Sequence, residues 1–273
     1  MSTTDMAASQ PAPLRDAATV ALVRDTAEGI EVFLQRRVKQ MAFAGGVTVF
    51  PGGGVDHRDA DAEITWSGPD ARWWAEAFHT DEQTARELVC AAVRETFEEC
   101  GVLLATRLDG APVDPARFAT QRQQLVDKAL SLGDFLRTEG LSLRADLLRP
   151  LANWITPIIE KRRYDTRFFL AAMPEGQTAD GHTTEAEVAR WVGAQAALDA
   201  WAAGEHTLLP PTWAQLHYLA GFDTVADVLA AEPVIEPIEP SVTPGAGMAG
   251  LKFAGSERYF AVAADREVPG LSR

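Results

Sequence analysis

The sequence predicts an α+β fold in which a β-sheet is layered with helices, rather than a doubly wound parallel sheet. Two short β-type runs, residues 18–23 and 30–34, flank a turn-like segment and predict a hairpin. The first long helix pattern follows only at residues 85–100, where apolar residues recur at three- and four-residue steps. Strands and helices therefore come in a mixed order, without the regular alternation of a doubly wound fold and without an internal repeat.

The chain of 273 residues, with 47% apolar side chains, is long enough to bury a sizeable core. Its formal net charge of −14 argues against a broad nucleic-acid-binding surface, so we expect no nucleic-acid polymer as a partner. A small anionic substrate would need local cations in such a chain, either a metal ion or a cluster of Lys and Arg side chains.

The two cysteines, Cys90 and Cys100, lie on the predicted helix and are roughly 15 Å apart along its axis, too far for a disulfide. We therefore expect a reducing, cytoplasmic location. No apolar run approaches the roughly 20 residues of a membrane span. The N-terminus also lacks the basic and apolar segments of a secretory signal. The sequence leaves the oligomeric state open, with a homodimer as one option.

Composition divides the chain into three parts. Residues 1–14 are polar and rich in Pro and Ala, and we predict a flexible tail there. Residues 15–231 form the predicted main domain, and residues 232–273 form a C-terminal arm, since four prolines lie within residues 233–244. After the hairpin, the expected strands are residues 47–50, 154–159, 167–173 and 189–192, and the expected helices are residues 70–77, 85–100, 115–129, 132–139, 194–203, 211–220 and 224–231.

The long helix carries three glutamates, Glu95, Glu98 and Glu99, along one flank. Like charges at i,i+4 destabilise a helix by roughly 0.2–0.5 kcal/mol per pair, and a bound cation would offset this repulsion. Mg²⁺ prefers oxygen ligands of this kind. Upstream, a Pro-Gly-Gly-Gly run at residues 51–54 predicts backbone that bends tightly or approaches another group closely.

Residues 94–102, downstream of the Phe-Pro-Gly-Gly run, resemble the signature of the Nudix hydrolases, Gly-x5-Glu-x7-Arg-Glu-U-x-Glu-Glu-x-Gly-U, where U is bulky and apolar. The resemblance implies an α/β/α sandwich with a mixed sheet, and metal-dependent cleavage of a nucleoside diphosphate linked to another group. It implies Mg²⁺ or Mn²⁺ as the cofactor, held by Glu95, Glu98, Glu99 and a backbone carbonyl at Gly53. Arg94 would orient the glutamates.

The signature is split in this chain. Counting eight positions back from Arg94 reaches Arg86, where the signature has Glu. Gly53 lies 33 rather than six positions before Arg86, which indicates an insertion of 27 residues, assigned to residues 54–80. The neighbouring Glu87 is a candidate replacement for the absent glutamate.

A split signature is typical of the Nudix subfamily that contains a peroxisomal coenzyme A diphosphatase and its bacterial relatives. The resemblance extends to further runs: Trp154-Ile155-Thr156-Pro157, Arg163-Tyr164-Asp165-Thr166-Arg167-Phe168-Phe169, Trp191-Val192 and Leu209-Pro210-Pro211-Thr212. It implies that coenzyme A or an acyl-coenzyme A is hydrolysed to 3′,5′-ADP and phosphopantetheine or its acyl form. The alternatives are an ADP-ribose or NADH-type dinucleotide diphosphatase, and a module that binds a nucleotide without cleaving it.

The segment before the signature meets half of the pattern that is common in coenzyme A-cleaving Nudix enzymes. Arg37 and Gly46 stand at the expected offsets, whereas Ala42 fills a slot for Arg. Arg37 is therefore a candidate for substrate binding, and Arg36 or Lys39 would supply the second charge.

The predicted reaction needs a general base for the attacking water. Glu98 or Glu99 would serve, and Glu185 or Glu187, in a polar loop before Trp191, are the alternatives. As loop carboxylates, the latter two would otherwise be solvated.

Two further clusters each have a functional and a structural interpretation. The densest basic cluster of this acidic chain consists of Lys161, Arg162, Arg163 and Arg167. It would hold substrate phosphates, or it would form a solvated hairpin tip. The aromatic side chains of the insertion are Trp66, Trp73, Trp74 and Phe78. They would form a lid or stack on a purine, or they would pack a subdomain or a dimer contact.

Overall fold

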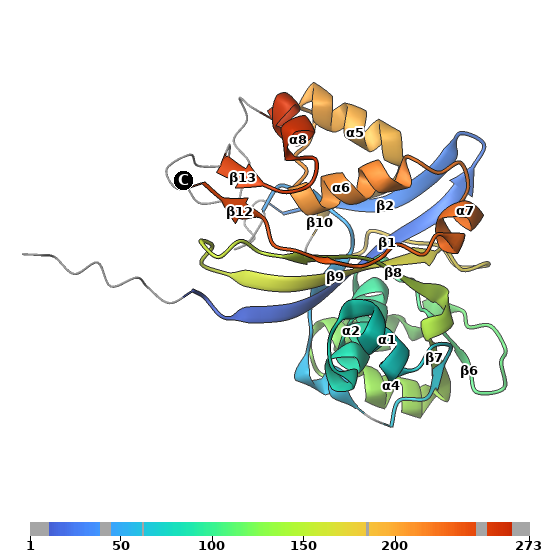
Figure 1. Cartoon of the computed structure of the whole chain (residues 1–273). Helices are drawn as coiled ribbons and strands as arrows, with labels where there is room; N and C mark the ends of the chain where they lie inside the picture. Colours follow the sequence, from blue (N-terminus) through green and yellow to red (C-terminus); the bar gives the residue numbers. More distant parts are fainter. Residues whose placement is uncertain (1–10, 39–44, 62, 184–185, 244–249, 264–273) are drawn as a thin grey trace, which may run out of the picture.

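A computed structural model of the chain describes residues 11–38, 45–61, 63–183, 186–243 and 250–263. A mixed eight-stranded sheet forms the middle layer, and helices cover both of its faces (Figure 1). The expected α/β/α sandwich is thereby confirmed. No helix in the described ranges is long and apolar enough to span a bilayer.

The centre of the sheet is a parallel pair, β1 (Leu14–Thr26) and β9 (Arg163–Ala172). The sheet order is β10-β2-β1-β9-β8-β11, and the remaining pairs in this path are antiparallel except β8 with β11. The other strands are β2 (Gly29–Arg37), β8 (Leu148–Ile155), β10 (Ala186–Gly193) and β11 (Pro237–Ile238), with β3 (Thr48–Val49) on β2 and β4 (Gly52–Gly54) on β1.

Alternation along the strands divides the core into two halves. Val20 and Leu22 of β1 face the layer of α1 (Ala71–Phe78) and α2 (Glu82–Cys100). Ala21 and Val23 face the layer of α5 (Ala194–Ala203), α6 (Pro210–Leu219), α7 (Val225–Ala230) and α8 (Ser256–Ala263). Because successive side chains of a strand point to opposite faces, one apolar run serves both layers.

Most predicted elements are present, with shifted ends. The hairpin of β1 and β2 turns between Thr26 and Gly29, and the predicted helices at 132–139 and 194–203 match α4 (Leu132–Glu139) and α5. Strand β8 begins earlier than predicted because it tolerates Pro150 at a register shift, where the missing N–H costs no ladder bond. The predicted helix at 115–129 splits into η2 (Pro115–Phe118) and α3 (Ala119–Val126).

Several short elements were absent from the sequence prediction, and most of them are too short to show a period. They are η1 (His57–Ala60), η3 (Ala145–Leu147), the strands β12 (Ser241–Val242) and β13 (Leu251–Lys252), helix α8, and a small sheet of β5 (Trp66–Ser67), β7 (Leu141–Arg144) and β6 (Ala105–Arg107).

Two of the aromatic side chains of residues 54–80, Trp74 and Phe78, pack inward, whereas Trp73 is 42% exposed. Trp74 and Phe78 on α1 are buried, with ring centroids 5.4 and 5.0 Å from that of Phe169 in the central sheet. The ring centroid of Trp66 lies 5.0 Å from the guanidinium carbon of Arg86. The structure thus favours the packing role for this segment.

The described parts of the C-terminal arm pack on the main domain. Strand β11 extends the central sheet beside β8. Glu239 forms an ion pair with Arg163 at 2.6 Å, and Tyr259, fully buried, donates its hydroxyl to the Leu208 carbonyl at 2.8 Å. Residues 232–243 and 250–263 therefore pack as part of the same body.

Candidate active site

Helix α2 presents its acidic residues at its C-terminal end, beside β4. The helix begins after Asp81, whose carboxylate accepts from the Thr84 N–H at 2.9 Å. It ends at Gly101, whose φ of 69° is the left-handed conformation that glycine adopts at little cost. These two caps define where the helix begins and ends, so its last two turns lie beside β4.

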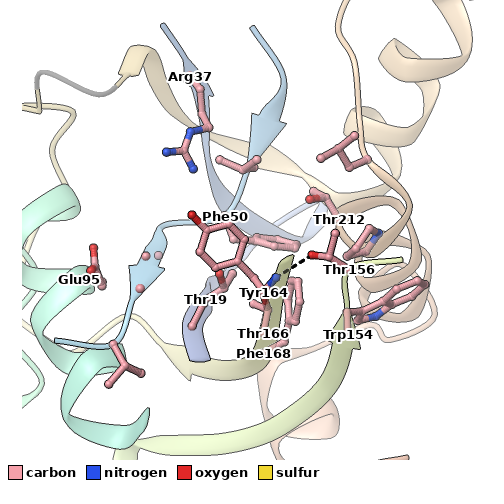
Figure 2. Close-up of a pocket in the computed structure, with 18 of the residues that line it drawn as sticks. Thr19, Arg37, Phe50, Glu95, Trp154, Thr156, Tyr164, Thr166, Phe168 and Thr212 are labelled. Atoms are coloured by element: carbon pink, nitrogen blue, oxygen red, sulfur yellow. Dashed lines mark hydrogen bonds between the residues drawn. The ribbon is translucent and has the colours of Figure 1, made fainter. Parts of the chain in front are cut away.

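A cavity of about 530 Å³ opens at this junction (Figure 2). The α2 end, β4, the end of β8, the start of β9 and the start of α6 enclose it. Its lining includes Arg94, Glu95, Glu98 and Glu99 of α2, Gly52, Gly53 and Gly54 of β4, and Thr19, Arg37, Phe50, Trp154, Thr156, Tyr164, Phe168 and Thr212 from the rest of the fold.

All three predicted metal-binding glutamates line this cavity. Glu99 accepts from the Gly52 N–H at 2.9 Å. Glu95 lies against Gly53 so closely that a Cβ at this glycine would sit 2.5 Å from Glu95 Oε1. The glycine run is thus needed for a close approach between β4 and the carboxylates, as the sequence predicts.

Arg94 holds the acidic cluster together. Its Nη1 donates to Glu95 at 2.8 Å and to Glu98 at 3.3 Å, and its Nη2 donates to the Gly54 carbonyl at 3.0 Å. Burial alone would lower the pKa of this guanidinium, but the charges of Glu95, Asp59 and Glu98 outweigh burial and raise the pKa. Arg94 is therefore a permanent cation that orients two of the glutamates, which is the role expected of it.

Asp59, on η1, is a buried partner of Arg94 that the sequence analysis missed. Arg94 Nε donates to Asp59 Oδ1 and Arg94 Nη2 to Asp59 Oδ2, each at 3.0 Å. Asp59 Oδ2 also accepts from the Asp56 N–H at 2.9 Å, and only 1% of the residue is exposed. The aspartate thus ties the segment after β4 to the guanidinium.

The opposite part of the cavity is built from runs that the family resemblance had singled out. Figure 2 shows Glu95 and Arg37 on one side of Tyr164, and Trp154 and Thr212 on the other. The Tyr164 N–H donates to Thr156 Oγ1 at 3.0 Å, which joins β9 to the end of β8. Residues far beyond the α2 end in the sequence, such as Tyr164 and Thr212, thus share its cavity.

Of the predicted substrate-binding arginines, Arg37 lines the cavity. Arg163 is buried and donates to the Thr156 carbonyl and to Glu239, at 3.0 and 2.6 Å. Arg167 is also buried and pairs with carboxylates on β1 and β9, Asp16 at 2.9 Å and Asp165 at 2.7 Å. Arg162 and Lys161 are exposed at the turn between β8 and β9 and are not part of the cavity lining.

Of the two loop glutamates predicted as general bases, only Glu187 lies within the described residues. Glu187 lies on β10, where it pairs with Arg36 at 3.4 Å, and it is not part of the cavity lining. Glu185 lies outside the described residues. Glu87 accepts from Gln83 on the exposed side of α2, away from the cavity, so it does not replace the absent glutamate.

A family model for the NUDT19 Nudix domain matches residues 75–219, more than half of the chain. The chain belongs to the Nudix hydrolase family.

Relatives from animals and bacteria agree with this assignment. The chain is 29% identical to the acyl-coenzyme A diphosphatase NUDT19 of Gallus gallus over 72% of its own length and 62% of that protein, and 29% identical to the Homo sapiens protein of the same name over 74% and 64%. It therefore spans somewhat less than two thirds of these relatives. The crystal structure of a Nudix hydrolase from Alicyclobacillus acidocaldarius superposes with a TM-score of 0.68 at 29% identity, covering 82% of this chain and 98% of that one.

Asp59 offers a second way to place the split in the Nudix signature. Counted forward from Gly53, the signature's first glutamate falls at the sixth position, which is Asp59. With this count we propose that the insertion lies between Asp59 and Arg94, as an alternative to the predicted place between Gly53 and Arg86. Asp59 would then supply the signature's carboxylate as an aspartate, which a count backward from Arg94 across the insertion does not reach.

Nudix hydrolases generally use divalent cations, and the donors at this cavity fit such ions. Three carboxylates and the backbone carbonyls of β4 supply oxygen atoms only, which hard cations such as Mg²⁺ and Mn²⁺ prefer. Across the described part of the chain, no three His, Cys, Asp or Glu side chains already converge as a metal cluster. Arg94 and the Gly52 N–H hold the carboxylates instead, so an ion would draw Glu95 and Glu98 from Arg94.

Proposed function

We propose that this protein hydrolyses the diphosphate linkage of coenzyme A or an acyl-coenzyme A, giving 3′,5′-ADP and phosphopantetheine or its acyl form. Glu95, Glu98 and Glu99, with a carbonyl at Gly53, would hold Mg²⁺ or Mn²⁺. The observation that carries the proposal is the joint presence of these glutamates and Arg37 on one cavity that is large enough for a nucleotide derivative. The names of the animal relatives support the choice of substrate.

A bound divalent cation would neutralise charge on the diphosphate and lower the pKa of an attacking water. The protein's own groups supply binding and orientation. Arg37, which lines the same cavity, would pair with a phosphate oxygen of the substrate. Arg94, anchored by Asp59, would orient Glu95 and Glu98 at the cavity before a cation binds to them.

Glu98 is our choice for the proton acceptor. Glu99 is already oriented by the Gly52 N–H, and Glu95 is held by Arg94 at 2.8 Å and packs on Gly53. Glu98 has the longer contact with Arg94, 3.3 Å, and faces the cavity. Its carboxylate would take the proton as the water oxygen bonds to phosphorus, and the bridging oxygen would leave with the other phosphate.

The test is a substrate panel with Mg²⁺ or Mn²⁺, containing coenzyme A, an acyl-coenzyme A, ADP-ribose and NADH, with products identified by mass. We expect cleavage of the coenzyme A compounds and a fall in rate of about 10²–10⁴-fold for Glu98→Gln. Glu87→Gln is the matched control, since it makes the same change on the exposed side of the same helix.

Each other result contradicts part of the proposal. Release of AMP from ADP-ribose without cleavage of coenzyme A would mean that the substrate is of the ADP-ribose type and not coenzyme A. Tight binding without turnover of any compound would favour the non-catalytic alternative. Equal losses of cleavage rate in Glu98→Gln and Glu87→Gln would mean that Glu98 is not the proton acceptor.

A further inference from the structure

The C-terminal arm forms part of the cavity wall, outside the segment that the family model matches. Pro240 and Leu251 both line the cavity, and the matched segment ends at residue 219. Strand β11 pairs Ile238 with Trp154, which also lines the cavity, so the arm runs directly beside this wall. The arm is therefore placed to contact whatever fills that end.

Buried contacts fix the arm in this position. Leu251 is 4% exposed and pairs with Val242 across β12 and β13. Glu239, next to Pro240, is held by the buried Arg163 at 2.6 Å. Beyond Leu251, the ring of Phe253 packs edge-on against Trp154 with centroids 5.6 Å apart. The wall is thus a packed surface and not a loose covering.

The two ends of the cavity differ in charge. Among the lining residues of the described chain, the cations are Arg37, Arg94 and Lys128, and the anions are Asp56 and the three glutamates of α2. The wall beside the arm has none of these. It consists of apolar and small polar side chains, namely Trp154, Leu209, Pro210, Thr212, Pro240 and Leu251.

We propose that the arm forms the binding wall for the uncharged, acylated pantetheine part of the substrate. This rests on the proposed function and names the part of the substrate that this wall selects. The nucleotide half carries a 3′-phosphate, which needs a cation and therefore belongs with Arg37 at the other end. An acyl-pantetheine carries no charge beyond its own phosphate. Burial of its methylene groups against Leu251 and Pro240 would lower the free energy of the complex.

The apolar surface continues outward from this wall. Pro157 lines the cavity, and the next two residues, Ile158 and Ile159, are 56% and 55% exposed. A longer acyl chain would find apolar contacts there after leaving the wall.

The test measures binding of two probes that lack a diphosphate and cannot be turned over by this chemistry, 4′-phosphopantetheine and S-octanoyl-4′-phosphopantetheine. The full-length protein with Mg²⁺ is titrated with each by calorimetry. We expect the octanoyl probe to bind at least about tenfold more tightly, which corresponds to burial of about two methylene groups.

Leu251→Trp should reduce this difference to less than about threefold, because the larger ring fills the wall. Leu108→Trp is the matched control, since Leu108 is 65% exposed outside the cavity, and it should keep the full difference. Glu239→Gln weakens the contact with Arg163 and should also reduce the difference in affinity between the two probes. It serves as the test variant if Leu251→Trp does not fold.

Equal affinity of the wild type for both probes, or no binding of either, would overturn the arm's role. An unchanged difference in the folded variants would do the same. Hydrolysis of coenzyme A is scored separately, so tight octanoyl binding without hydrolysis would refute the proposed function and leave this inference standing.

Discussion

Asp59 and Arg94 lie 35 positions apart in the chain and meet through two hydrogen bonds of 3.0 Å. The same guanidinium reaches Glu95 and Glu98, so the aspartate acts on the acidic cluster through Arg94. The segment between the two residues includes α1 and its buried aromatic side chains. The insertion thus lengthens the Nudix signature without removing the contact that orients its arginine.

Asp59→Asn is expected to destabilise the protein by about 3–5 kcal/mol, because it leaves a buried cation with one carboxylate fewer. Urea unfolding measures this, and the folded fraction should also have a lower kcat, because Glu95 and Glu98 lose their fixed orientation. Asp61→Asn is the control: it removes a partner of Arg137, whose side chain is 41% exposed, and should cost less than about 1 kcal/mol. Equal costs in the two variants would argue against the anchoring role.

Gly53→Ala should weaken binding of Mg²⁺ or Mn²⁺ at least about tenfold, because the new Cβ would lie 2.5 Å from Glu95 Oε1 and displace this carboxylate. Calorimetric titration with the metal alone measures the effect. Gly54→Ala is the matched control, since nothing lies within 4 Å of the corresponding Cβ. If Gly53→Ala bound metal as the wild type does, Glu95 would not be a ligand.

Arg37→Ala is expected to raise KM for coenzyme A by about tenfold or more with a smaller change in kcat, because it removes a charge-assisted contact made in both ground and transition states. Steady-state kinetics separates the two constants. The neighbouring Arg36→Ala, on a side chain that pairs with Glu187, should leave both nearly unchanged. A fall confined to kcat would assign Arg37 to the chemical step.

Asp180 should stabilise the protein in a pH-dependent way. Burial alone would raise its pKa, but the two hydrogen bonds from Arg122, at 2.8 and 2.9 Å, together with the His182 N–H and the Arg122 charge, outweigh burial and lower it. Because the folded-state pKa lies below the unfolded value of about 3.9, the contribution is present above about pH 4 and is lost as pH falls through the folded-state pKa. Asp180→Asn should therefore cost about 1 kcal/mol at pH 7 and less at pH 3, measured by urea unfolding. An equal or larger cost at pH 3 would contradict this assignment.

The α2 end could be predicted from the sequence because its information is local. Helical spacing placed Glu95, Glu98 and Glu99 on one flank, and the glycine run marked a close approach that proved to be that of Gly53 to Glu95. The sandwich followed from the family resemblance. Compartment and oligomeric state stay predictions.

The sequence could not show which charged residues, far apart in the chain, form ion pairs with one another. Arg163 and Arg167 look like free cations in a basic cluster until the fold brings Glu239 and Asp16 to them from the two ends of the chain. A buried guanidinium requires such partners, so burial decided their role. The arm's place on the cavity wall depends likewise on the pairing of β11 with β8.

The most direct test of the central claim is the mass of the products formed from coenzyme A by the full-length protein with Mg²⁺ or Mn²⁺. We predict 3′,5′-ADP and 4′-phosphopantetheine in equal amounts, with neither formed by Glu98→Gln at a comparable rate. Intact coenzyme A after incubation with the folded wild-type protein, under conditions where the metal binds, would contradict the account.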